Sequence, residues 1–93
     1  DVDLQAHTVQ VSGTVVRLTP RELALVAYLL AEAPRVVSAV EIAAVIGADP
    51  QAVSPIRIRK YVQNVRRKLN KARPGQPAVL ENVRGLGYRL VDN

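Results

Sequence analysis

The stretch RIRKYVQNVRRKLNK, residues 57–71, combines two patterns that bear on the fold and on the function. Apolar residues recur in it at Ile58, Val62, Val65 and Leu69, which is the spacing of a helix with one core-facing stripe. The same stretch holds seven basic residues and no acidic one. Surface helices usually mix the two signs, because Glu and Lys four residues apart support each other. The stretch therefore predicts a helix whose other face is either a solvated surface or a contact surface.

The distribution of charge along the chain favours a contact surface. The net charge of the 93 residues is +5, but the 31 residues between Asp49 and Glu81 hold eight Lys or Arg and no acid. The rest of the chain is therefore net negative, and a domain divided in this way has one positive face. Such a face is typical of proteins that bind a polyanion. A solubilising surface with a basic bias is the alternative.

The composition restricts the class of protein. A hydrophobic content of 48% with 23% charged residues is ordinary for a globular domain. Cys is absent, which excludes disulfides and indicates a reducing, cytoplasmic location. No apolar run approaches the roughly 18 residues of a membrane span. With one His, at position 7, and no nucleophile–base arrangement, we expect no metal, no cofactor and no enzyme activity.

The first segment, residues 1–18, predicts a small antiparallel sheet. We expect strands near 2–5, 8–11 and 14–18, with Ser12-Gly13 as a two-residue turn. Alternation places Val9, Val11 and Val15 on the inner face, and Leu18 is a further candidate.

The second segment, residues 19–72, predicts three helices. Thr19 with Glu22 forms a capping box around Pro20, and Pro34 ends the first helix. Its expected inward residues are Leu23, Val26, Ala27 and Leu30, while Leu25 and Leu29 make it apolar nearly all round.

The next two helices have similar signals. Ser38 and Glu41 cap a short second helix that Gly47 ends. Ser54 caps the third, which begins with Pro55 and runs to about Ala72. Residues 78–91 predict a β-hairpin around the turn 84–87, and residues 35–37 could add a short strand.

The third helix departs from helix physics in its first turn. The other two helices place Glu there, where the positive end of the helix dipole favours it, whereas this one places Arg57 and Arg59. The arrangement becomes favourable when a phosphate approaches. With the apolar stripe inward, positions 56, 59, 60, 63, 64 and 67 face outward.

These outward residues suit DNA. Arg matches guanine, and Asn or Gln matches adenine, in the major groove, so we expect Arg59, Gln63 and Asn64 to contact base edges. We expect the remaining basic side chains to contact phosphates, namely Arg57, Lys60, Arg66 and Arg67.

At LTPRELALVAYLL, RVVS, NVRRKL and above all VRGLGYRL, the sequence resembles the OmpR/PhoB-type output domain of bacterial response regulators, from about Leu18 to Val91. The resemblance implies an α+β winged helix-turn-helix with a four-stranded N-terminal sheet, three helices and a C-terminal wing. It also implies that the third helix enters the major groove while the wing contacts the minor groove through Arg84, with Asn82 beside it and Tyr88 near the DNA backbone.

The sequence also departs from the family pattern. Ile46 stands where the family often has Trp, beside the loop associated with RNA polymerase contact. Arg59 replaces a common Asp, and Asn64 replaces a common Arg. The operator and the polymerase contact are therefore the points at which this chain is expected to differ from its family.

We therefore expect residues 1–93 to form one winged-helix domain that binds double-stranded DNA in a bacterial transcription regulator. Tandem dimers on DNA are a further expectation, as is an additional N-terminal domain in the full-length protein, since the chain begins at Asp1 rather than Met. The alternatives are a protein-interaction module that has lost DNA binding, and binding to double-stranded RNA by shape.

Overall fold

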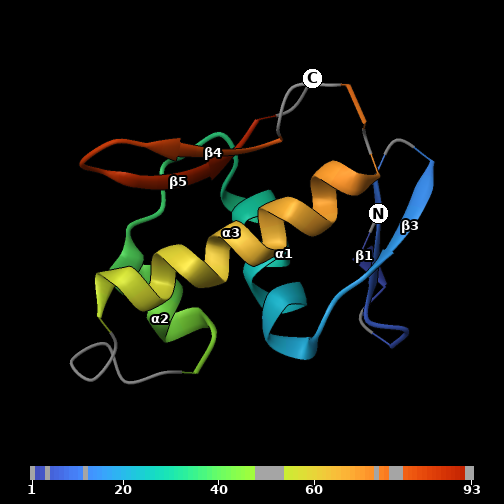
Figure 1. Ribbon diagram of the computed structural model, residues 1–93. Coiled ribbons are helices and arrows are strands. Elements are labelled where there is room, and N and C mark those ends of the chain that lie inside the picture. Colours follow the sequence, from blue (N-terminus) through green and yellow to red (C-terminus); the bar gives the residue numbers. More distant parts are fainter. Residues whose placement is uncertain are drawn as a thin grey trace.

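The computed structural model describes residues 2–3, 5–11, 13–47, 54–72, 74–75 and 79–91. Three strands come first: β1 (Val2–Asp3), β2 (Thr8–Val11) and β3 (Thr14–Arg17). The helices α1 (Pro20–Glu32), α2 (Ala39–Val45) and α3 (Pro55–Lys71) follow, and a hairpin of β4 (Leu80–Val83) and β5 (Gly87–Leu90) ends the fold. Figure 1 shows α3 crossing the front of the molecule, with α1 and α2 behind it. This is the predicted winged helix-turn-helix.

All three helices begin at the predicted caps. Thr19 and Ser38 each form a capping box with the Glu three residues later. The Ser54 hydroxyl accepts a hydrogen bond from the backbone N–H of Arg57 at 3.2 Å, without an acid in the first turn. Each cap satisfies a backbone donor that the first helical turn leaves unpaired, which is typically worth about 1 kcal/mol.

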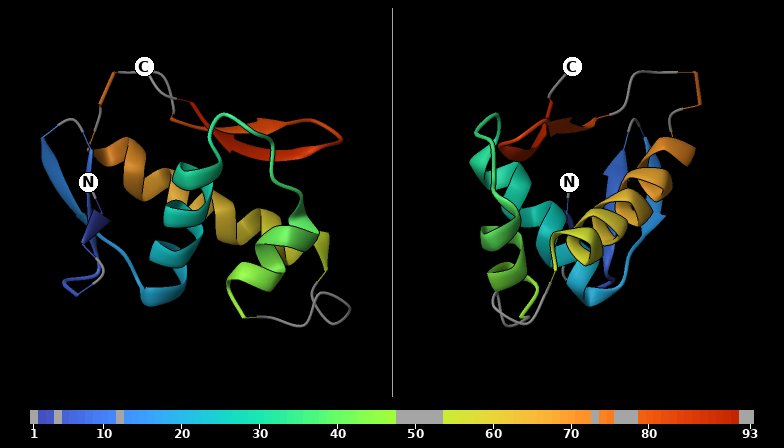
Figure 2. Two further views of the ribbon diagram at one scale, coloured as in Figure 1. Left: turned by 180° about the vertical axis from the view of Figure 1, so that it is seen from behind. Right: turned by 60° about the vertical axis from the view of Figure 1, so that its left-hand side comes forward.

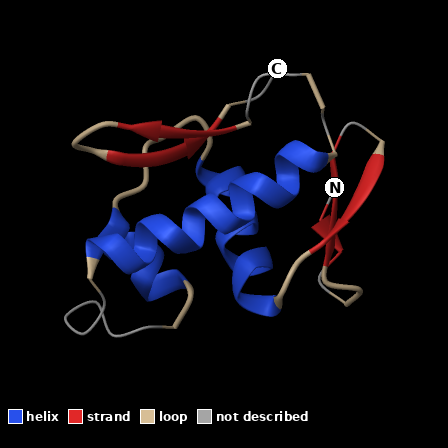
Figure 3. Ribbon diagram, viewed as in Figure 1, coloured by secondary structure: helices blue, strands red, loops and turns tan. Residues whose placement is uncertain are grey.

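The N-terminal sheet is antiparallel in the order β1-β2-β3, so among the described residues it has three strands rather than the four implied by the resemblance. Figure 3 shows this sheet on the right, separate from the β4–β5 hairpin. The first strand is shorter than predicted. The Asp3 carboxylate accepts hydrogen bonds from the N–H groups of Gln5 and Ala6, both at 3.0 Å, and turns the chain there. Leu4 and Ser12, which belong to the predicted strand and turn, lie outside the described residues.

The inward prediction for Val15 is wrong. The hairpin pairs Val9 with Val16 and Gln10 with Val15, and directly opposed residues share a face of the sheet. Val16 is therefore buried beside Val9, while 64% of Val15 is exposed. Leu18 is buried, as its candidacy suggested.

The buried face of α1 extends beyond the stripe that helical spacing predicted and includes Leu25 and Leu29. Leu23 and Val26 are buried as expected, but the most deeply buried residues are Leu25 and Leu29. Leu30 is 51% exposed, because it lies about 100° around the helix from Leu29 and points away from the core. The prediction of Leu30 as an inward residue is therefore wrong, and Ala27 is only half-buried.

The apolar stripe of α3 lies in the centre of the core, as predicted. Ile58, Val62, Val65 and Leu69 are each at most 3% exposed. They pack in one cluster with the inner residues of α1, α2, the N-terminal sheet and the hairpin. Burial of such a side chain contributes roughly 2 kcal/mol. The rotation of α3 about its own axis is therefore determined by four side chains.

The hairpin of β4 and β5 is anchored to the segment between α1 and α2. Val37 donates its backbone N–H to the carbonyl of Tyr88 at 2.7 Å and accepts the N–H of Tyr88 at 2.8 Å. The strand expected at 35–37 is thus reduced to one bridging residue. Figure 2 shows this segment passing beside the hairpin. Gly87 permits the approach, since its φ is 149° and a Cβ would lie 2.1 Å from the Val37 carbonyl oxygen.

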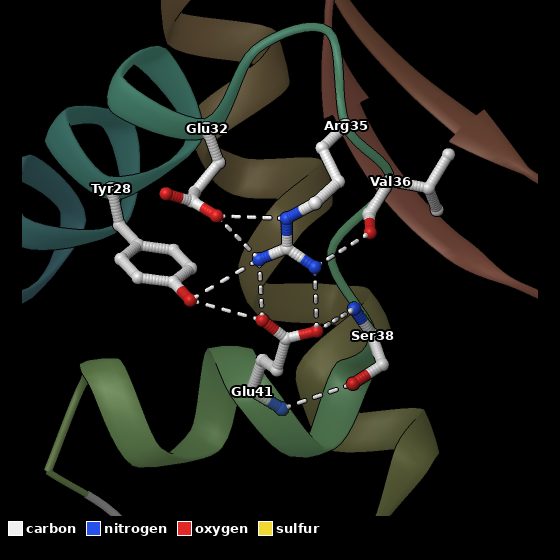
Figure 4. Close-up of polar contacts among 6 residues, drawn as sticks. All are labelled: Tyr28, Glu32, Arg35, Val36, Ser38 and Glu41. Atoms are coloured by element: carbon white, nitrogen blue, oxygen red, sulfur yellow. Dashed lines mark hydrogen bonds and ion pairs between the residues drawn. The ribbon is translucent and has the colours of Figure 1, made fainter.

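A polar network joins α1 to α2 (Figure 4). The Arg35 guanidinium bonds the Glu32 carboxylate at 2.8 Å and the Glu41 carboxylate at 2.7 Å. Tyr28 donates its hydroxyl hydrogen to Glu41 at 2.9 Å. The hydrogen bonds from Arg35 and then Tyr28 lower the pKa of the Glu41 carboxyl to about 2. The same carboxylate completes the capping box of α2, so the network sets where α2 begins relative to α1.

The close approach at Gly87 yields a stability prediction. Gly87→Ala would press a methyl group against the Val37 backbone, so we expect a loss of about 3 kcal/mol in the free energy of unfolding, measured by urea denaturation. Gly85→Ala is the matched control, because its φ is 80° but a Cβ there meets no atom within 4 Å. It should cost only about 1 kcal/mol. Equal losses in the two variants would contradict the anchoring role.

The lowered pKa of Glu41 yields a pH prediction. The ionised Glu41 carboxylate stabilises the folded state fully above pH 4.5, and this stabilisation is lost as the pH falls through about 2. Glu41→Gln should therefore lower the melting temperature at pH 7, and the difference from wild type should shrink steadily between pH 4.5 and pH 2. Thermal melts followed by circular dichroism test this. A difference as large at pH 2 as at pH 7 would show that the ionised carboxylate contributes nothing.

Candidate nucleic-acid interface

The outer face of α3 presents the residues that the sequence predicted for DNA contact. Arg57, Arg59, Lys60, Gln63, Asn64 and Arg67 are exposed, and Arg66 is half-buried. The helix places them on different parts of that face. Intervals of four, three and four residues align Ile56, Lys60, Gln63 and Arg67 in one central stripe. Arg59 and Asn64 lie on opposite sides of this stripe.

The wing lies beside the first turns of α3 (Figure 1). Arg84 is exposed in the turn after β4, and Asn82 is exposed on β4 itself. The wing and the start of α3 line a common open groove. Its lining residues are Pro55, Ile56, Arg59, Asn82, Arg84, Gly85 and Tyr88. The structure thus brings together residues from two segments that are more than 20 positions apart in the sequence.

The basic residues of the chain differ in whether a carboxylate partners them. In the part of the chain that the structure describes, Arg35, Lys68 and Arg89 form ion pairs, at distances of 2.7 to 2.9 Å. The described ion pairs include none of the predicted contact residues Arg57, Arg59, Lys60, Arg66, Arg67 and Arg84. Five of the six lie on α3, with Arg57 and Arg66 on opposite flanks of its outer face, and Arg84 lies on the wing, so all six belong to the surface of these two elements. That surface therefore carries a positive charge that the described carboxylates do not neutralise.

Lys68 is the exception on α3, and its partner is buried. Glu22 is only 5% exposed, and one of its oxygens accepts both the Lys68 ammonium at 2.7 Å and the Thr19 N–H at 2.9 Å. Burial alone would raise the pKa of Glu22, but these hydrogen bonds outweigh it and the pKa is lowered. The pair ties the start of α1 to the second half of α3. Lys68 therefore holds the helix in place rather than adding free charge to its outer face.

Two further residues on α3 have informative positions. Tyr61 packs against the core, and burial of its hydroxyl raises its pKa to about 12. Ile56, which sequence reasoning placed on the outward face without assigning it a role, is 68% exposed. The signal was available in the sequence: an aliphatic residue at an outward position of an otherwise polar face.

The pair between Lys68 and Glu22 yields a prediction. Lys68→Met keeps most of the aliphatic stem and removes the ammonium group, so we expect the free energy of unfolding to fall by about 1 kcal/mol, since Lys68 is itself partly exposed. NMR titration should show the pKa of the Glu22 carboxyl rising in this variant. Lys71→Met, an exposed change three residues later, should alter stability by less than about 0.5 kcal/mol. Equal effects of the two variants on stability would show that the ion pair between Lys68 and Glu22 does not stabilise the fold.

Comparison with known proteins identifies the family of this chain. The family model described as "Transcriptional regulatory protein, C terminal" matches residues 13–90. The sensory transduction protein RegX3 of Mycobacterium tuberculosis and of Mycobacterium bovis is 34% identical over 90 residues, which is 96% of this chain and 39% of the relative. The chain thus spans about two fifths of the length of these curated relatives.

Two solved structures show the same fold. The DNA-binding domain of the response regulator AdeR, in complex with an intercistronic region, superimposes with a TM-score of 0.83 at 24% identity, over 100% of this chain and 94% of that one. A streptococcal redox sensor evolved from two-component response regulators superimposes with a TM-score of 0.81 at 26% identity, over 99% of this chain and 39% of that one.

The described helices include none that is long and apolar enough to cross a membrane. The family is one of DNA-binding domains of transcription regulators, not a class of enzymes. The chain belongs to this family, the OmpR/PhoB-type winged-helix DNA-binding domains found at the C-terminus of bacterial response regulators.

Proposed function

We propose that this domain binds double-stranded DNA sequence-specifically, with α3 in the major groove and the wing turn at Arg84 in the adjacent minor groove. The observation that carries the proposal is the joint surface of α3 and the wing, where six basic side chains have no carboxylate partner among the described residues. DNA phosphates supply the missing negative charge. No chemical step is involved.

On α3, the polar residues fall into two groups, those suited to base edges and those suited to phosphates. Arg59 can donate two parallel hydrogen bonds to guanine, and Gln63 and Asn64 can each pair with adenine. Arg57, Lys60, Arg66 and Arg67 contact the phosphates on either side and set the register of the helix in the groove. The positive end of the α3 dipole adds to the attraction for a phosphate near the first turn.

On the wing, Arg84 is the residue proposed for the minor groove, with Asn82 beside it. A narrow, A·T-rich minor groove attracts an inserted Arg because its negative potential is enhanced. Tyr88 lines the groove between the wing and α3 but is 8% exposed, so only its edge is available to the DNA backbone. Packing against the core remains its main role.

For the whole protein, the family supports a proposal of one further domain and of pairing on DNA. The matched segment is 39% of RegX3, and the family model describes a C-terminal part. We therefore propose a receiver-type domain N-terminal to this one, and tandem pairing of two copies on direct repeats. A contact with RNA polymerase stays a prediction, since Ile46 is buried at 9% exposure and residues 48–53 lie outside the described residues.

Fluorescence anisotropy with a mixed-sequence duplex between roughly 50 and 200 mM salt tests the proposal. Affinity should fall by about 0.9 log unit per phosphate contact for each decade of salt. Arg59→Ala and Arg84→Ala should each weaken binding by about tenfold. Arg17→Ala is the matched control, because it removes the same charge from β3, at the far end of α3 from the wing (Figure 1), and should have little effect.

The outcome separates the rivals. No binding at the lowest salt would indicate a protein-interaction module, and preference for an RNA duplex in competition would indicate shape recognition. The groove assignment of Arg84 is tested by replacing A·T pairs under the wing with inosine·cytosine pairs, which resemble A·T in the minor groove but G·C in the major groove. Retained affinity supports a minor-groove contact, and a loss as large as with G·C pairs argues against it.

A further inference from the structure

Ile56 is an exposed aliphatic side chain on a face of α3 whose other outward residues are polar or charged. It is the second residue of α3 and is 68% exposed. It begins the central stripe that continues through Lys60, Gln63 and Arg67, so it points to the middle of the proposed contact face. An exposed Ile is common on protein surfaces, but this one lies where a ligand is proposed to bind.

The surroundings of Ile56 restrict what it can meet. It lines the groove between α3 and the wing together with Arg59, Asn82 and Arg84. A partner that fills this groove has to be strongly anionic, because two guanidinium groups line it, and it has to offer an apolar atom to Ile56. Double-stranded DNA meets both conditions, since thymine carries a C5 methyl group on its major-groove edge.

We propose that Ile56 packs against the C5 methyl of one thymine and thereby selects a T·A pair at one position of the operator. This rests on the proposed function, in which α3 lies in the major groove. The first residues of such a helix are the ones that reach base edges. Ile has no hydrogen-bonding group, so it distinguishes thymine from cytosine by the methyl group alone.

The test removes that methyl group from the DNA and the side chain from the protein. An operator selected from a random library by the 93-residue chain is resynthesised with each thymine replaced in turn by deoxyuridine, which pairs identically but lacks the C5 methyl. At one position the replacement should weaken wild-type binding by about fourfold, the value expected for exposing one buried methyl group. With Ile56→Ala, replacement at that position should change affinity by less than about 1.5-fold.

Leu86→Ala is the matched control, because Leu86 is also 68% exposed but lies in the wing turn. It should retain the full deoxyuridine effect at that position. A deoxyuridine effect that persists in Ile56→Ala, or that appears at no thymine, would overturn the contact. The proposed function would then still stand if Arg59→Ala and Arg84→Ala weaken binding. If the chain binds no duplex at all, the proposed function fails and the thymine contact fails with it.

Discussion

The structure depends on the burial of one face of α3. Ile58, Val62, Val65 and Leu69 are almost completely enclosed, and each successive residue is turned by about 100° around the helix axis. A rotation of the helix by one position would bring Arg57 or Arg59 toward the core, where an unpaired charge costs several kcal/mol. The core therefore determines which side chains face outward. The same four contacts that stabilise the domain orient its candidate binding surface.

Three ties hold the elements around α3, and two of them join segments that are distant in the sequence. Glu22 at the start of α1 bonds Lys68 in the second half of α3, 46 residues away. Val37 bridges to Tyr88 and fixes the wing hairpin near its turn. Arg35 joins the end of α1 to the first turn of α2. These ties use polar groups that α3 and the wing do not need for the proposed DNA contact, so structure and binding are assigned to different residues.

Local rules account for the features that were predictable. The caps at Thr19, Ser38 and Ser54 depend on residues only three positions apart. The apolar stripe of α3 depends only on the helical period, so the sequence alone predicts both features. The errors were of a different kind. Alternation from Val9 through Val11 predicts Val15 on the inner face, whereas the pairing of Val9 with Val16 across the hairpin decides which residues share that face. Leu30 was placed inward by helical spacing alone, but the position of α1 in the core exposes it.

The helical period places Lys68 outside the outward positions that include Arg67, but it could not have predicted which residue Lys68 contacts. Only the packing of α1 against α3 brings Glu22 within 2.7 Å of its ammonium group. The common location of the unpaired residues Arg59 and Arg84, in contrast, could be predicted from the resemblance. That Arg59 and Arg84 lie on one surface follows from the position of the wing, which the resemblance implied and which local periodicity alone could not supply.

The first turn of α3 departs most clearly from the charge and burial preferences that the rest of the chain follows. The other two helices place an acid at their positive end, and α3 places Arg57 and Arg59 there. Ile56, in the same turn, exposes an aliphatic side chain to water. Each feature costs the free domain a few tenths of a kcal/mol or more. Such violations are expected where a surface is selected for binding rather than for stability. DNA would reverse both costs at once, because its phosphates neutralise the Arg side chains and its thymine methyl groups cover the aliphatic one.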